Sequence, residues 1–113
     1  MNAVSRKVSP PYANFIDNTD DLVMIYCGSR AWELAKPDQD RVASLVFPSN
    51  RDPVEYRWPV LGKDVLILGQ GLDRVTAAYL IVEQLRNGAG KVYVRYEDEI
   101  GLTCYDSAEP SAA

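Results

Sequence analysis

The chain contains no histidine and only two cysteines, and these scarcities exclude several kinds of active site. Without histidine there is no imidazole to act as a general base, to complete a Ser-His-Asp triad or to hold zinc in the usual ligand sets. Cys27 and Cys104 lie far apart within apolar runs and form no C-x-x-C pair. We expect both to be small buried hydrophobic residues of a protein in a reducing compartment. A phosphatase-like role for Cys27 would need an arginine at position 33, where the chain has Glu33.

Long apolar runs and basic clusters are also missing. The apolar runs, such as residues 77–82, are far shorter than the roughly 20 residues that span a bilayer. The N-terminal sequence leads into Ser9, Pro10 and Pro11 and not into the apolar segment of a signal peptide, so we expect a cytoplasmic protein that binds no membrane. Because no group of lysines and arginines is available to neutralise phosphates, we expect no direct contact with nucleic acid.

The negative charge is concentrated at the C-terminal end. The net charge is -4, and residues 95–113 contain one basic residue, Arg95, and five acidic residues, Glu97, Asp98, Glu99, Asp106 and Glu109. The remaining residues therefore carry no net charge. An acidic end favours a protein partner with a basic surface, or it serves solubility alone.

The length and composition indicate one globular domain. A chain of 113 residues, 47% of them hydrophobic, buries a core large enough to need no disulfide or metal for stability. Residues 1–13 are rich in proline and serine and have little periodicity, which predicts a flexible N-terminal arm. We expect a single α/β domain at residues 14–106 and a disordered tail at residues 107–113.

Alternating apolar runs and helical segments predict the order of the elements. Apolar runs at 22–27 and 65–68 have the composition of buried strands, and a third strand is expected at 92–96. A short helix is expected after Ser29 and before Pro37, and a longer helix from Asp73 to Asn87. A strand, a crossover helix and a second strand imply a parallel pair.

Other segments are less distinct. Residues 38–47 are typical of either a helical turn or a short strand, and we favour a strand at 43–47. Residues 53–60 alternate in polarity, but their prolines restrict them to a sheet edge or an extended loop. Residues 102–105 are expected to form an antiparallel edge strand. The predicted fold is therefore α/β, with a small mixed, partly parallel sheet of about four or five strands and two main helices packed on it.

The sequence Gly69-Gln70-Gly71 follows a predicted strand and opens a helix, as in a dinucleotide-binding loop. Glu97, after the next strand, stands where such a site has an acidic residue for the ribose. However, Arg74 occupies the position of the third glycine. Asp73 would cap the helix and occupy the amide groups that a phosphate needs. We therefore favour a sharp strand-to-helix corner and keep nucleotide binding by Gly69, Gln70, Gly71 and Glu97 as the alternative.

Glu97, Asp98 and Glu99 form an acidic cluster after the third strand. Such carboxylates sometimes hold Mg²⁺, usually together with carboxylates from other elements. Neighbouring side chains on a strand point to opposite faces, so only Glu97 and Glu99 could cooperate. A solvated acidic turn is the favoured interpretation, and no metal site or cofactor is expected.

The helix at residues 73–87 is nearly apolar all round in its first two turns, where a surface helix would show a polar face. Those turns need cover from the N-terminal arm, from the loop of Trp58 or from a second protein chain. An exposed apolar face commonly marks a protein interface, including that of a homodimer. Tyr56, Arg57 and Trp58 are residue types common at interface hot spots, although the two aromatic residues would equally serve as core residues.

These observations predict a non-enzymatic protein-binding module. We expect a small acidic inhibitor or adaptor of a nucleic-acid-handling protein complex, of the general composition found in inhibitors from phages and mobile elements, including anti-CRISPR proteins. Its partner-binding residues are expected to be Tyr56, Arg57, Trp58, Glu97, Asp98 and Glu99. The alternative is a nucleotide-binding or nucleotide-processing domain that uses the Gly69-Gln70-Gly71 loop.

Overall fold

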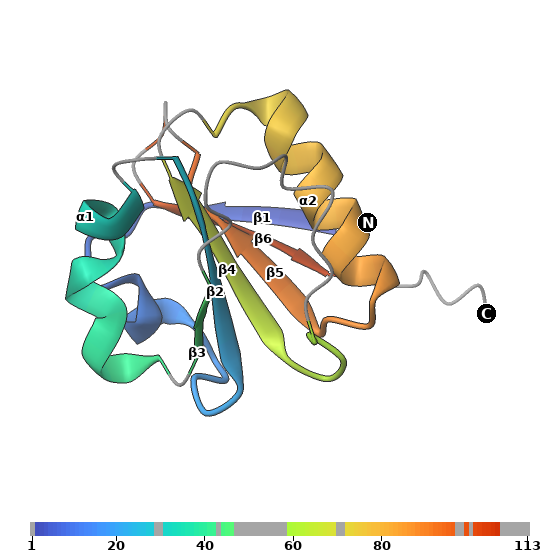
Figure 1. Ribbon diagram of the computed structural model, residues 1–113. Coiled ribbons are helices and arrows are strands. Elements are labelled where there is room, and N and C mark those ends of the chain that lie inside the picture. The colour runs from blue at the N-terminus through green and yellow to red at the C-terminus, as the bar shows by residue number, and fades with distance from the viewer. Residues whose placement is uncertain are drawn as a thin grey trace.

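The computed structural model describes residues 2–28, 31–42, 44–46, 59–69, 72–96, 99 and 101–106. These residues form one six-stranded sheet with the strand order β1-β6-β5-β4-β2-β3 (Figure 1). The strands are β1 (Asn2–Arg6), β2 (Leu22–Cys27), β3 (Ser44–Val46), β4 (Asp64–Gly69), β5 (Lys91–Val94) and β6 (Leu102–Asp106). The helices are α1 (Ala31–Ala35) and α2 (Arg74–Arg86), with 3-10 turns η1 (Tyr12–Phe15) and η2 (Lys36–Arg41).

The sheet is mixed and partly parallel, as predicted. β3, β2, β4 and β5 run parallel to one another, whereas β6 is antiparallel to β5 and β1 is antiparallel to β6. The predicted unit of strand, helix and parallel strand is β4, α2 and β5. The short strand favoured within residues 43–47 is β3, and the helical turn considered for the preceding residues is η2.

The two faces of the sheet carry separate hydrophobic clusters because successive strand residues point to opposite sides. Val23, Ile25, Val65 and Ile67 pack on the face covered by α2. Their neighbours Leu22, Met24, Tyr26, Leu66 and Leu68 pack on the other face with Tyr12 and Ala35. Both central parallel strands, β2 and β4, are buried throughout. This double cover explains why their sequences are continuous apolar runs without alternation.

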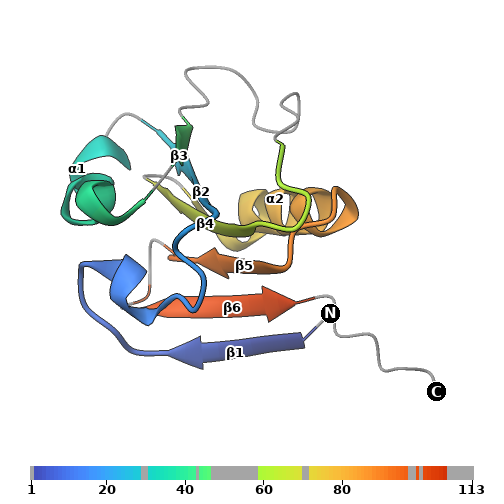
Figure 2. The same ribbon diagram turned by 90° about the horizontal axis from the view of Figure 1, so that it is seen from below.

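The N-terminal residues differ from the prediction of a flexible arm. Asn2–Arg6 form β1, which pairs along its whole length with β6 and makes an edge of the sheet (Figure 2). β6 is antiparallel, as expected for residues 102–105, but β1 places it inside the sheet instead of at its edge. The sheet consequently has six strands, not four or five.

A buried carboxylate joins the segments that cover the second face. Asp38 is fully buried in η2, and its Oδ1 accepts a hydrogen bond of 2.6 Å from the backbone N–H of Ala13 in η1. Burial raises the pKa of the Asp38 carboxyl group, and the backbone hydrogen bonds oppose that shift. Asp38 therefore holds η1 against η2 at the side of the sheet that α2 leaves free.

Some predictions fall outside the described residues. These include the alternating segment at residues 53–60, apart from Pro59 and Val60, and the C-terminal tail. None of the helices in the part of the chain described has the length and hydrophobicity needed to cross a membrane.

Candidate functional site

Helix α2 begins at a well-defined cap. The Asp73 side chain accepts a hydrogen bond of 2.8 Å from the backbone N–H of Thr76, as predicted for this helix start. This hydrogen bond also lowers the pKa of the Asp73 carboxyl group. At the other end Asn87 is the cap residue, and Gly88 has a positive φ of 94°. The helix therefore has the bounds that its sequence predicts, within one residue at each end.

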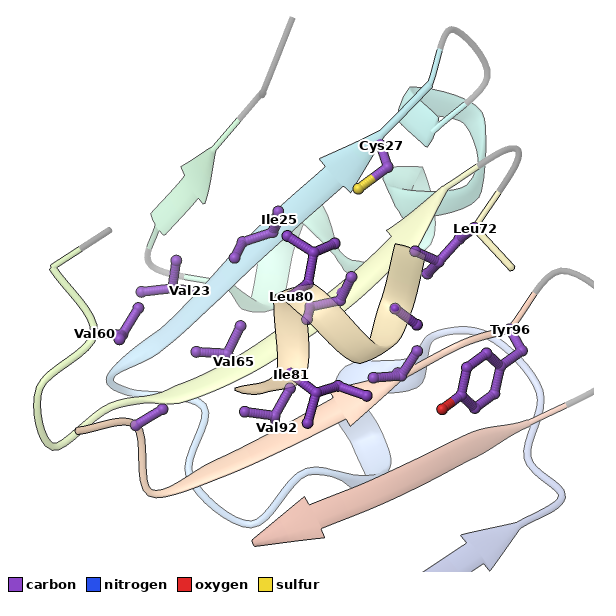
Figure 3. Packing of buried hydrophobic residues seen from close by; sticks show 14 residues of the cluster. Val23, Ile25, Cys27, Val60, Val65, Leu72, Leu80, Ile81, Val92 and Tyr96 are labelled. Atoms are coloured by element: carbon purple, nitrogen blue, oxygen red, sulfur yellow. The ribbon is translucent and has the colours of Figure 1, made fainter. Parts of the chain in front are cut away.

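The inner side of α2 packs on the sheet. Ala77, Leu80 and Ile81 are buried among Val65, Val92 and other residues of the first cluster (Figure 3). Leu80 retains 1% of its surface exposed. Gln84 is also fully buried on α2. This side of the helix is committed to the core.

The outer side of α2 is apolar and exposed. Val75 is 68% exposed and Tyr79 is 63% exposed, and Val82 is exposed to a smaller degree. With Ala78 these residues line a shallow, open depression of about 740 Å³, which Arg74, Glu83 and Arg86 border. We call Val75, Ala78, Tyr79 and Val82 the outer α2 face. Within the part of the chain that the structure describes, no segment therefore provides the cover that the sequence suggested for this side of the helix.

A cluster of polar and aromatic side chains lies at the N-terminal end of this face. The Arg74 guanidinium group lies 3.8 Å from the centre of the Tyr96 ring and forms an ion pair with Glu99. The Tyr96 hydroxyl group in turn shares a hydrogen bond with that of Tyr105 on β6. Cation–π contact and ion pairing together place the segment after β5 against the start of α2. Glu99, one of the predicted partner-binding residues, consequently adjoins the outer α2 face.

Gly69, the first residue of the Gly69-Gln70-Gly71 sequence (the glycine corner), has a structural explanation. Gly69 ends β4 directly beside Cys27 at the end of β2, and a Cβ atom at position 69 would overlap the Cys27 carbonyl oxygen. Gly69 is therefore required by the close approach of two strands. Asp73 takes the Thr76 amide group, as expected for a capped corner. Gln70, Gly71 and Glu97, the other residues of the alternative nucleotide site, lie outside the described residues.

The corner nevertheless occupies a special place in the sheet. The chain runs from β2 outward to β3 on one side and then returns to β4 and β5 on the other side of β2. The boundary between β2 and β4 is thus the point where the strand order reverses. In open α/β sheets ligands commonly bind at the carboxyl ends of the strands at such a point.

Several other residues of the predicted sites lie in parts of the chain that the structure does not describe. Glu97 and Asp98 of the acidic cluster, and Tyr56, Arg57 and Trp58, lie outside the described residues. Among the residues that the structure describes, no group of three or more aspartate, glutamate, cysteine or histidine side chains is arranged to hold a metal ion. Cys27 and Cys104 are free thiols; Cys27 is buried, and burial raises its pKa to about 11, which makes it a poor nucleophile.

Sequence reasoning missed the contribution of Arg74, which it treated only as an obstacle to a glycine motif. Arg74 stands at the start of the helix and Glu99 follows 25 residues later, so no local sequence pattern connects the two side chains.

Comparison of the chain with models of known protein families, with curated proteins and with solved structures finds no match. The function must therefore be inferred from geometry and chemistry.

Proposed function

We propose that the protein is a non-enzymatic protein-binding module that engages its partner through the outer α2 face. The observation that carries this proposal is the exposure of Val75 and Tyr79, at 68% and 63%, on a helix whose opposite side is buried. Contiguous apolar surface on a folded protein is costly unless a partner covers it. Tyrosine is also among the residue types that contribute most to binding energy at interfaces.

The partner is a different protein that presents an apolar ridge with basic residues beside it. The apolar ridge would fill the depression along Val75, Ala78 and Tyr79. The basic residues would face the acidic segment that begins after β5, of which Glu99 adjoins the helix. A helix of 13 residues is only about 20 Å long, so two copies of this face alone would bury less than a standard dimer interface. An inhibitor or adaptor of a nucleic-acid-handling complex would meet such a basic partner.

Site-specific photocrosslinking in the native host tests this proposal. A photoreactive phenylalanine analogue replaces Tyr79, and the control carries it at Leu61, which is 81% exposed, lies beside Gly88 beyond the C-terminal end of α2 and does not line the depression. We expect one discrete adduct from position 79, identified by mass spectrometry as a single partner protein, and none from position 61. The adduct should disappear when Val75 is changed to aspartate. Absence of an adduct, an equal adduct from position 61, or an adduct of twice the chain mass would contradict the proposal.

A nucleotide-binding function is the second candidate, because Cys27 and Gly69 meet where the strand order reverses. Thermal unfolding with a panel of nucleotides, dinucleotides and Mg²⁺ separates the two candidates. A ligand at about 100 times its Kd adds roughly 2.7 kcal/mol of stability, which should raise the midpoint by on the order of ten degrees. The protein-binding proposal predicts no shift. A shift that a bulky residue at Gly71 abolishes would establish the nucleotide site instead.

A further inference from the structure

A second cavity lies on the opposite side of the sheet from α2, over strands β5, β6 and β1. Its volume is about 240 Å³, and η1 borders it through Phe15. Figure 2 shows these three strands side by side at one end of the sheet. α1 and η2 lie toward the parallel strands at the other end (Figure 1). The cavity is thus separate from the outer α2 face and from the glycine corner.

The strand register determines how the cavity is lined. Val4, Cys104 and Tyr93 are paired across the three strands and form its central row. Arg6 and Leu102 form the next row, about 6.7 Å away along the strands. The row on the other side contains Lys91 and Asp106. The centre of the cavity is therefore mostly apolar, and charged groups stand at its two ends.

The two ends differ in how their charges are matched. At one end Lys91 Nζ donates a hydrogen bond of 2.9 Å to Asp17, and Asp106 lies beside them. At the other end Arg6 has its guanidinium group 5.7 Å from the centre of the Phe15 ring. In the described ranges no carboxylate forms an ion pair with Arg6. Arg6 is thus a cation at the mouth of an apolar cavity. Its charge reaches the carboxylate of Asp17, but that carboxylate is held by the hydrogen bond from Lys91.

Val4 is an apolar residue of this cavity that remains exposed. It lies in the middle of β1, in the central row of the cavity, yet 64% of its surface is exposed. The neighbouring Leu102 and Tyr93 in the cavity are buried. An apolar ligand that crosses the central row would cover Val4 and remove this surface from water.

We propose that this cavity binds a small amphipathic monocarboxylate. The carboxylate accepts hydrogen bonds from the Arg6 guanidinium group, whose fork of N–H groups matches it. The hydrocarbon part lies over Val4, Cys104 and Leu102. A volume of 240 Å³ is equivalent to about eight water molecules, which suits a chain of roughly that many carbon atoms. A second carboxylate at the far end of the ligand would meet Asp17 and Asp106, so a dicarboxylate should bind less well.

Titration with octanoate, followed by calorimetry and by amide NMR shifts, tests the proposal. We expect saturable binding in the micromolar to millimolar range, with the largest shifts at Val4 and Cys104. Octylammonium and acetate, which lack the carboxylate or the chain, should bind at least about tenfold more weakly. Saturating octanoate should also slow the labelling of the half-buried Cys104 thiol several-fold. No saturable binding, or equal binding of octylammonium, would overturn the proposal.

Two variants and a matched control locate the site. Arg6→Ala should weaken octanoate binding at least about tenfold, whereas Lys7→Ala, which removes the neighbouring exposed cation, should leave it unchanged. Val4→Trp should abolish binding by filling the cavity. Arg6 and Val4 are exposed, so both variants should keep the wild-type unfolding midpoint. Octanoate binding that is equally strong in Arg6→Ala and in the wild type would refute the assignment.

Discussion

Replacing Gly69 by alanine is expected to lower the free energy of unfolding by at least about 3 kcal/mol. The added Cβ atom would overlap the Cys27 carbonyl oxygen and lie within 2.7 Å of the Cys27 nitrogen. Both contacts are with backbone atoms, which cannot move aside as a side chain can. The ends of β2 and β4 would have to separate, and these are the two central strands of the sheet. Urea unfolding followed by circular dichroism measures the loss.

Gly62 provides the matched control for this substitution. It also has a positive φ, of 73°, but a Cβ atom there would meet nothing within 4 Å. Gly62→Ala should therefore cost only the conformational penalty of a left-handed residue, about 1–2 kcal/mol. An equal loss of stability in the two alanine variants would contradict the claim that β2 and β4 approach too closely at Gly69 to admit a Cβ atom.

Leu80→Ala is expected to destabilise the protein by about 2–5 kcal/mol, because it leaves a cavity between α2 and the sheet. Tyr79→Ala, at the adjacent position on the same helix, should change stability by no more than about 0.5 kcal/mol. Leu80 is buried in the first cluster and Tyr79 is 63% exposed. Leucine and alanine both favour helices, so helix propensity contributes little to the Leu80 effect.

Parallel urea titrations of the two variants measure this difference directly. A large gap would establish that the inner side of α2 holds the fold while the outer side is free for another use. A comparable loss in Tyr79→Ala would mean that the outer α2 face is packed within the chain, and the protein-binding proposal would lose its basis.

The central part of the fold was predictable because its signals are local. Buried parallel strands are continuous apolar runs, and Asp73 and Gly88 stand at the ends of α2. β1 was not predictable in the same way. Its partner β6 lies at the other end of the chain: Ser5 and Thr103, a paired couple in the two strands, are 98 residues apart. A five-residue edge strand with mixed polarity carries no pattern that distinguishes it from a loop.

The sequence could predict the apolar character of the candidate site but not which residues form it. The sequence shows that α2 is apolar on all sides, but which side faces water depends on how the helix lies on the sheet. Val75 and Leu80 are equally apolar in sequence, and only the tertiary structure separates them. Glu99 was expected to contact a partner; its ion pair with Arg74 adds that it lies at the end of the outer α2 face.

The most direct test of the proposed function is the dissociation constant of the partner captured through position 79. It should be measured with the wild-type protein, with Tyr79→Glu and with Leu61→Glu, which adds the same charge at another exposed hydrophobic residue. We predict that Tyr79→Glu weakens binding at least about thirtyfold, as expected for a central interface residue, and that Leu61→Glu leaves it unchanged. Equal affinities for all three proteins would contradict the assignment of the outer α2 face as the binding surface.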